Sequence, residues 1–264
     1  MKNIILHITK LSKHFALSQS VMNRQTAEVL SSVELQVERG TLSTILGSNG
    51  AGKTTLFNII SGFESCQQGE IWFYPSGKNP VKLLNLKAHQ RAQAGIGRML
   101  QGSSVFARLS VEENILMSAA PGKSWQNFYS SETKTGGQHS LLVKRAAGFL
   151  TRTGIDYEAV RHARAGTLSA AGQRLLAFAM LYVSEAELLL LDEPCSGIHH
   201  DQLPVLAAAL EILLNEHKTL LLIEHNLDFV SMIPGTCHYL TEGHIQQSGS
   251  TKEMVSLYKN EQGC

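Results

Sequence analysis

Short runs of apolar residues, each about the length of a β-strand, recur along the chain. Ile4–Lys10 and Val33–Val37 alternate apolar and polar positions, which is the pattern of strands with one buried face. Thr41–Leu46 and Gly69–Tyr74 are also predicted to be strands. The polar stretch Ser18–Thr26 predicts a loop between the first two strands.

Two continuous aliphatic runs, Leu188–Leu191 and Leu220–Ile223, predict strands of a different kind. Runs of this length are typical of strands that are covered on both faces, as in a parallel sheet. Gln202–Asn215 lies between them and has helical periodicity, so the order strand, helix, strand predicts an α/β sheet with a right-handed crossover. Lys53–Ile60 also has helical character and stops at Gly62.

The middle of the chain, from about residue 88 to residue 183, is richer in helical patterning. Within it, Pro121–Ser140 contains Pro, Gly, Ser, Thr, Gln and Lys but few aliphatic residues, which predicts a loop-like surface insertion near 121–140. The chain has 264 residues and no internal repeat. We therefore expect a single domain over 1–264, with a helical subdomain at approximately 88–183.

Composition then narrows the class of function. Hydrophobic residues make up 43% of the chain, and 23 basic against 22 acidic residues leave a net charge of +1, which argues against binding nucleic acid by bulk charge. No stretch approaches the ~20 apolar residues of a membrane span, and Met1–Lys10 lacks the features of a secretory signal. The scattered cysteines favour a reducing cytosol over a disulfide framework or a zinc site; they are Cys66, Cys195, Cys237 and Cys264.

The strongest chemical signal is a glycine-rich segment that fits G-x-x-x-x-G-K-[ST] between a predicted strand and a predicted helix. It comprises Gly47, Ser48, Asn49, Gly50, Ala51, Gly52, Lys53, Thr54 and Thr55. Glycines let successive N–H groups curl around phosphate oxygens, and the dipole of the following helix favours the same anion. We expect Lys53 to reach the β- and γ-phosphates and the Thr54 hydroxyl to ligate Mg²⁺. The alternative is a glycine-rich turn with a surface lysine, which the strand-to-helix context disfavours.

A second signal follows the aliphatic run that begins at Leu188. Asp192 and Glu193 come directly after this run, at the strand end where α/β sheets bind ligands. We expect Asp192 to orient Mg²⁺ or its water shell, and Glu193 to polarise an attacking water. An acidic pair after a strand is also common on solvated surfaces, but its place in the same predicted sheet as Lys53 favours the functional interpretation.

The segments Gly47–Thr55 and Leu188–Pro194 resemble the Walker A and Walker B motifs of the ATP-binding cassette (ABC) transporter ATPases. The resemblance extends over essentially the whole chain. It implies an α/β fold of the P-loop NTPase class, that of an ABC ATPase, with a mostly parallel sheet core, an antiparallel β subdomain and an inserted helical subdomain. It also implies ATP and Mg²⁺ as cofactors.

Three further segments occur in the order that this family has. Gln101, at the end of Gly95–Gln101, resembles the Q-loop glutamine, whose family role is to touch Mg²⁺ and the attacking water and to relay motion to the membrane subunits. His225 is similar to the switch histidine that contacts the γ-phosphate. Val105–Asn114 resembles the segment that packs against the coupling helix of the transmembrane partner. Taken alone, Gln101 and His225 are each compatible with an ordinary polar position. The occurrence of the motifs in the order of the family favours a functional role for both residues.

Other details resemble one branch of the family. Leu56–Phe63, Gly95–Arg98 and Ile223–Val230 are similar to the cassettes of branched-chain amino acid importers and of the related urea importers. Phe15 lies in the region where the family has an aromatic residue, so stacking on adenine is one interpretation of it. A core phenylalanine is an equal alternative, because the polar stretch after Phe15 looks like an insertion.

Two segments depart from the family pattern. The usual second glycine of the signature falls on Ala171 in the run Leu168-Ser169-Ala170-Ala171-Gly172-Gln173. Ser169 still offers its hydroxyl to a nucleotide held by an opposite subunit, whereas the methyl group of Ala171, or a φ that needs glycine, would hinder the approach of the backbone. His199 stands where the family usually has Asp or Asn. It introduces pH dependence if its pKa is near neutrality, and otherwise it is a tolerated surface residue.

The resemblance implies an ATPase subunit that powers solute uptake through separate transmembrane permease subunits. It implies a second ABC ATPase subunit as partner, in a homo- or heterodimer, no nucleic acid partner, and a cytoplasmic, peripheral place on the inner face of the cell membrane. The altered signature motivates the alternative of a regulatory subunit with weak ATPase activity in an asymmetric heterodimer. A soluble ABC protein that acts on ribosomes or chromosomes is disfavoured, because such chains usually carry two cassettes or a long coiled coil.

Overall fold

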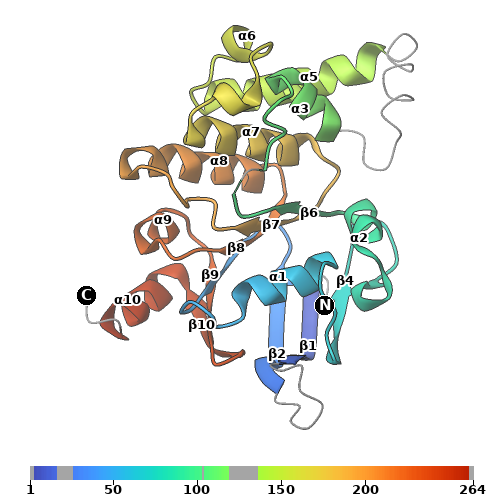
Figure 1. Ribbon diagram of the computed structural model, residues 1–264, viewed down its shortest axis with the longest axis vertical. Coiled ribbons are helices and arrows are strands. Elements are labelled where there is room, and N and C mark those ends of the chain that lie inside the picture. Colours follow the sequence, from blue (N-terminus) through green and yellow to red (C-terminus); the bar gives the residue numbers. More distant parts are fainter. Residues whose placement is uncertain (1–2, 17–25, 103, 119–135, 262–264) are drawn as a thin grey trace.

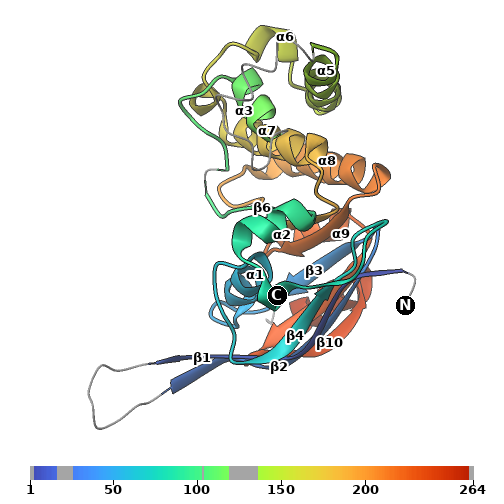
Figure 2. The ribbon, with the colours of Figure 1, turned by 90° about the vertical axis from the view of Figure 1, so that its right-hand side faces the viewer.

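The strands of the protein form two sheets in the computed structural model, which describes residues 3–16, 26–102, 104–118 and 136–261 (Figure 1). The first sheet has four strands in the order β2-β1-β4-β5, and its neighbouring strands are antiparallel. Its strands are β1 (Ile4–Ala16), β2 (Thr26–Glu38), β4 (Gln68–Phe73) and β5 (Val81–Lys82). In Figure 2 the paired ends of β1 and β2 project beyond the rest of the molecule.

The second sheet has six strands in the order β10-β9-β3-β8-β7-β6. Every neighbouring pair is parallel except β9 and β10. Its strands are β3 (Leu42–Leu46), β6 (Ile96–Met99), β7 (Leu188–Asp192), β8 (Thr219–Ile223), β9 (Thr236–Thr241) and β10 (His244–Ser250). The predicted α/β fold, with a mostly parallel sheet and a separate antiparallel sheet, is confirmed.

The aliphatic runs in β7 and β8 are continuous because each strand is buried on both faces. Leu189 and Leu191 belong to a core that also contains the buried side of helices α7 and α8. Leu188 and Leu190 belong to a second core, formed with β1, β2 and α1. Since successive side chains of a strand point to opposite faces, a strand between two cores has no polar face.

Helices cover the second sheet and form a separate group above it (Figure 1). The group contains α3 (Val111–Ser118), α5 (Gly136–Arg152), α6 (Tyr157–Val160) and α7 (Ala170–Val183). The other α-helices are α1 (Lys53–Ser61), α2 (Ala88–Ala94), α8 (Leu203–Asn215), α9 (Leu227–Met232) and α10 (Thr251–Glu261). Short 3₁₀ helices are η1 (Leu83–Asn85), η2 (Ala165–Thr167) and η3 (His200–Gln202). Among the described helices, none has the length and apolar character needed to cross a bilayer.

Several boundaries differ from the sequence prediction. Helix α5 begins at Gly136, so the end of the predicted loop-like insertion is helical, while residues 121–135 lie outside the described part of the chain. The apolar repeat that begins at Leu141 sustains a helix whose first turn is polar in sequence. The predicted loop at 18–25 also lies outside the described residues, and Thr26 already belongs to β2. Strand β6 lies inside the region predicted to be helical.

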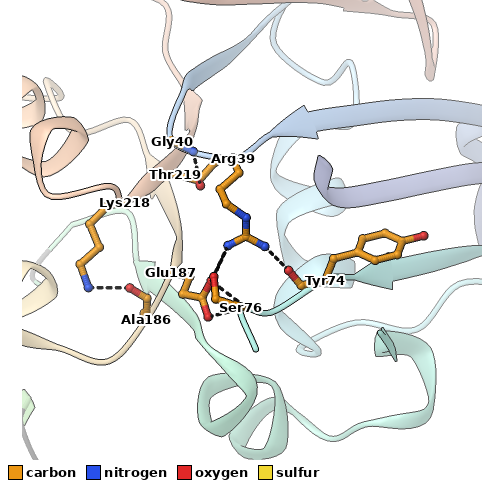
Figure 3. Close-up of polar contacts among 8 residues, drawn as sticks. All are labelled: Arg39, Gly40, Tyr74, Ser76, Ala186, Glu187, Lys218 and Thr219. Carbon is orange, nitrogen blue, oxygen red and sulfur yellow. Dashed lines mark hydrogen bonds and ion pairs between the residues drawn. The ribbon is translucent and has the colours of Figure 1, made fainter. Parts of the chain in front are cut away.

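A polar network joins the two sheets where β7 begins (Figure 3). The Glu187 carboxylate accepts hydrogen bonds from the Ser76 backbone N–H, at 3.0 and 3.1 Å, and from the Ser76 hydroxyl at 2.7 Å. It also forms an ion pair with Arg39, whose guanidinium donates to the carbonyl oxygen of Tyr74. This end of β7 is therefore fastened to the antiparallel sheet, and the opposite end carries the chemistry described next.

Candidate nucleotide site

The glycine-rich turn connects the buried strand β3 to helix α1. Gly52 has a φ of 100°, and a Cβ atom there would lie 2.7 Å from the carbonyl oxygen of Val29. A Cβ atom at Gly47 would lie 2.1 Å from the carbonyl oxygen of Leu240. Glycine is therefore required at both positions by the space available and, at Gly52, by the backbone angle. The residue before α1 is Gly52, which has no side chain to cap the helix, so the start of α1 has the form of an anion-binding helix N-terminus.

Lys53 is buried at the first position of α1. Its Nζ donates hydrogen bonds to the carbonyl oxygens of Gly47 and Ser48, both at 2.8 Å. Burial lowers the pKa of Lys53, and the carboxylates of Glu193 and Asp192 act in the opposite direction. The turn thus holds the amino group of Lys53 beside its own backbone carbonyls.

Asp192 ends strand β7 and is only 1% exposed. Its Oδ2 pairs with the Arg98 guanidinium at 3.1 Å, whereas its Oδ1 is buried and has no hydrogen-bond partner among the described residues. Burial raises the pKa of Asp192, and Arg98 counteracts this shift. One carboxylate oxygen without a partner fits a hard divalent cation, which prefers oxygen ligands and is neutralised by carboxylates. The exposed Thr54 at the start of α1 provides a second oxygen.

Glu193 stands between two other predicted site residues. Gln101 Nε2 donates to Glu193 Oε2 at 2.8 Å, and His225 Nε2 lies 3.1 Å from Glu193 Oε1. The three side chains follow the ends of β6, β7 and β8, which are adjacent parallel strands. Because the carboxyl ends of parallel strands share one edge of the sheet, residues 92 positions apart in the chain meet there.

A cavity of about 160 Å³ lies between the glycine-rich turn and the loops that follow β7 and β8. Its walls include Lys53, Thr54, Glu193 and His225. The remaining lining residues are Val29, Asn49, Gly50, Gly52 and Thr55. The structure therefore brings the glycine-rich turn, the carboxylate after β7 and the histidine after β8 around one space, with Gln101 in contact with Glu193.

Two sequence-predicted residues lie elsewhere. Phe15, on β1, is 38% exposed, and the Nζ of Lys13 lies 4.6 Å from the centre of its ring. The core interpretation of Phe15 is therefore wrong, because its side chain faces solvent at the projecting end of the hairpin. Ser169 caps α7, where its Oγ accepts the N–H of Gly172 at 3.1 Å, and it does not line the cavity.

The departures from the family pattern are accommodated without strain. Ala171 lies in helix α7 and is 7% exposed, so its backbone has no need for glycine and its methyl group is packed in the core of its own chain. The expected need for a glycine backbone at this position is therefore wrong, and the effect of the Ala171 methyl group on a nucleotide of an opposite subunit stays a prediction. His199 is exposed, just before η3.

Two charged residues that contact this region were not predicted from the sequence. Arg98 lies on β6 and holds Asp192, and its signal in the sequence was only a basic residue three positions before Gln101. Glu224 is buried between the loops that carry Glu193 and His225. In the sequence, Glu224 is simply the residue before the histidine, and no pattern shows that its carboxylate turns inward.

A phosphate-binding turn between a buried strand and a helix, with an acidic residue at the end of a parallel strand, defines a P-loop nucleotide-binding protein. Residues 30–196 match the family model described as ABC transporter. The chain belongs to the ABC transporter family and is an ATPase of that family, as the sequence motifs predicted.

Similar proteins agree with this assignment. The chain is 31% identical over 229 residues to the "High-affinity branched-chain amino acid transport ATP-binding protein LivG" of Salmonella typhimurium, covering 85% of this chain and 87% of that protein. It is 27% identical over 256 residues to the "Probable branched-chain amino acid transport ATP-binding protein LivG" of Archaeoglobus fulgidus, covering 96% and 91%. The predicted resemblance to the branched-chain amino acid branch is confirmed by these relatives.

Solved structures show the same fold. The chain superposes on the ADP conformation of MJ1267, an ATP-binding cassette of an ABC transporter, with a TM-score of 0.74 and 24% identity, covering 96% of this chain and 93% of that one. A dimeric structure of the cassette MJ0796 is similar with a TM-score of 0.70 and 19% identity, covering 94% and 99%.

Proposed function

We propose that this chain is the ATP-hydrolysing subunit of an importer that takes up branched-chain amino acids or a related small polar solute, such as urea, through separate permease subunits. The names of the relatives favour branched-chain amino acids over urea. The observation that carries the proposed activity is the placement of Glu193 between Gln101 and His225, on the cavity that also contains Lys53.

Binding of the nucleotide falls to the glycine-rich turn and to Lys53. The N–H groups at the start of α1 and the amino group of Lys53 hold the phosphates. Thr54, Asp192 and Gln101 are the residues that would hold Mg²⁺, and the bound ion supplies positive charge to the phosphate oxygens. The exposed ring of Phe15 and the hydroxyl of Ser169 are proposed to contact, respectively, the adenine and a nucleotide of the partner subunit.

Glu193 then acts on the attacking water. Its carboxylate orients the water or accepts its proton as the oxygen approaches the γ-phosphoryl group in line with the leaving oxygen. Gln101 and His225 hold this carboxylate from two sides. Lys53 and His225 stabilise the negative charge on the γ-phosphoryl oxygens in the transition state.

The proposed assembly contains a second ABC ATPase subunit and two membrane permeases, with this chain peripheral on the cytoplasmic face. The dimeric MJ0796 cassette supports such pairing. We propose that the permeases contact the segment Gln101–Asn114, in which the side chain of Phe106 is exposed. The regulatory alternative is not favoured, because Ala171 and Ser169 form a regular, capped start to α7.

Replacement of Glu193 by glutamine tests this function. We expect Glu193→Gln to bind ATP as the wild type does but to hydrolyse it at least ~100-fold more slowly, because the amide cannot accept a proton. Equilibrium ATP binding and steady-state phosphate release measure the two effects. Glu242→Gln is a matched control, since Glu242 also has a φ of 47° but lies in an exposed turn. Near-normal turnover in Glu193→Gln would remove Glu193 from the mechanism.

A further inference from the structure

We infer that Glu224 is a positioning residue that fixes the loop of Glu193 and the loop of His225 relative to each other; this inference rests on the proposed ATPase function. Glu224 follows β8 directly and is 3% exposed. Its Oε1 accepts the backbone N–H of Cys195 at 2.8 Å. Its Oε2 accepts the backbone N–H groups of His225, at 2.9 Å, and Asn226, at 3.1 Å.

The two oxygens of this carboxylate therefore serve different loops. Oε1 holds the loop after β7, and Oε2 holds the loop after β8. Hydrogen bonds to a charged acceptor are stronger than those between neutral groups, so three of them make a rigid connection. Arg174 of α7 supplies a compensating positive charge near Glu224, and its guanidinium also donates to the carbonyl oxygen of Gly102 at 3.2 Å.

The loop after β7 needs such a connection because Glu193 has a φ of 47°. This left-handed conformation costs free energy for a residue with a side chain, and it persists only where the surroundings enforce it. Glu193 N–H donates to the carbonyl oxygen of Ile223 at 2.9 Å, and the bond from Cys195 to Glu224 follows two residues later. These two bonds fix the backbone on both sides of the strained residue and so aim the Glu193 carboxylate.

The Glu224 carboxylate also sets the distance between the side chains of Glu193 and His225. His225 is held through its own N–H, and its ring lies 3.1 Å from the carboxylate of Glu193. A glutamine at position 224 would keep the size of the side chain, but its NH₂ group would face an N–H donor in one of the two loops. That loop would lose its anchor, and the contact between Glu193 and His225 would lose its geometry.

A purely structural role for Glu224 predicts a loss of stability without a specific loss of kcat. Glu187 is the residue with which Glu224 is compared. Glu187 is a carboxylate at the other end of β7 that also accepts a backbone N–H, and it ties the two sheets together (Figure 3). The five residues of β7 separate the two ends by about 16 Å. Loss of Glu187 should therefore weaken the fold without moving the proposed site.

The test compares Glu224→Gln, Glu224→Asp and Glu187→Gln by ATP hydrolysis and ATP binding in the complex of the chain with the subunits that co-purify with it, and by thermal unfolding of the full-length chain. We expect Glu224→Gln to lower kcat about 30- to 100-fold, while KM for ATP stays within about threefold, because misplacement acts on the reacting groups. Glu224→Asp retains the charge but is too short to reach both loops, so its kcat should fall between those of the wild type and Glu224→Gln. Glu187→Gln should lower Tm with kcat unchanged.

Each outcome decides the inference. An unchanged kcat in Glu224→Gln, or equal losses of kcat in Glu224→Gln and Glu187→Gln, overturns it while leaving the proposed function intact. If Glu224→Gln does not fold, the same criterion applies to Glu224→Asp, for which a wild-type kcat overturns the inference. If the wild-type chain does not hydrolyse ATP in its assembled complex, the proposed function is overturned, and this inference with it.

Discussion

Three buried charged side chains at the candidate site are linked to one another through Asp192, which interacts with both Arg98 and Lys53. Burial raises the pKa of Asp192 and lowers those of Lys53 and Arg98. Arg98 pairs with Asp192, and the carboxylates of Glu193 and Asp192 act against the effect of burial on the pKa of Lys53. At the scale of single residues, the site is therefore a set of mutually compensating charges rather than a collection of independent groups.

Another buried residue makes stability depend on pH. The ring of His238 is buried; its Nδ1 lies 2.8 Å from the Ser248 hydroxyl, and its Nε2 has no hydrogen-bond partner among the described residues. Burial lowers the pKa of His238 to about 4. Between its unfolded value of about 6.5 and this folded value, the unfolded chain binds a proton that the folded chain does not. Stability should therefore fall as the pH falls through this range.

We expect His238 to remove up to about 3 kcal/mol of unfolding free energy between pH 7 and pH 4. Chemical denaturation of the wild type and of His238→Gln across this range measures the effect. The variant should lose stability less steeply, because its amide does not titrate. Parallel pH profiles for the two proteins would contradict the assignment, since carboxylates then account for the whole dependence.

Adjacent parallel strands determine the site at the scale of elements. Strands β6, β7 and β8 end along one edge of the sheet, and Gln101, Glu193 and His225 follow those ends. The opposite end of β7 is fastened to the antiparallel sheet through Glu187 and Arg39. Strand β7 is also buried on both faces and paired with β6 and β8, and this burial and pairing give rigid support to the residue that follows it.

Helix α7 gives a prediction at the same scale. Ala171 has a helical backbone and a buried methyl group, so Ala171→Gly restores the usual signature glycine without relieving any strain within this chain. We expect the substitution to lower the unfolding free energy by about 0.5–1 kcal/mol, as glycine does in helices, and to leave ATP turnover unchanged. Thermal unfolding and phosphate release measure the two effects. Faster turnover in Ala171→Gly would show that the methyl group obstructs the nucleotide of a partner subunit.

Elements with a local signal were predictable from the sequence. The aliphatic runs marked β7 and β8, and the spacing of Gly47, Gly52 and Lys53 marked the turn before α1. Strand β6 was missed because it has only four residues and contains Gly97. A Cβ atom at Gly97 would come within 3.0 Å of the Leu189 side chain on the neighbouring strand β7. That close approach between strands has no counterpart in the local sequence.

Contacts that depend on the fold were not predictable. The motifs indicated Gln101, Glu193 and His225 one at a time, but their meeting depends on the strand order β6-β7-β8. The role of Glu224 depends on a side chain that turns inward to two loops. Neither property follows from periodicity or composition, because both are set by partners distant in the chain.

At the scale of the whole molecule, a single cassette with a net charge of +1 supplies one nucleotide-binding turn. In the proposed assembly, Ser169 at the start of α7 reaches a nucleotide held by a second subunit, so each ATP site is shared between two chains. In the same proposed assembly, membrane subunits convert the closure of the pair into movement of the solute. We propose that ATP hydrolysis promoted by Glu193 drives this movement.

Uptake into vesicles that contain the assembled complex tests this claim most directly. Membrane subunits that co-purify with the chain are reconstituted with wild-type protein or with Glu193→Gln, and ATP-dependent accumulation of leucine is measured with ATP on the side of the cassette. We expect uptake with the wild type, and at least ~100-fold slower uptake with Glu193→Gln although that complex still assembles and binds ATP. Uptake at the wild-type rate in the Glu193→Gln complex would contradict the account.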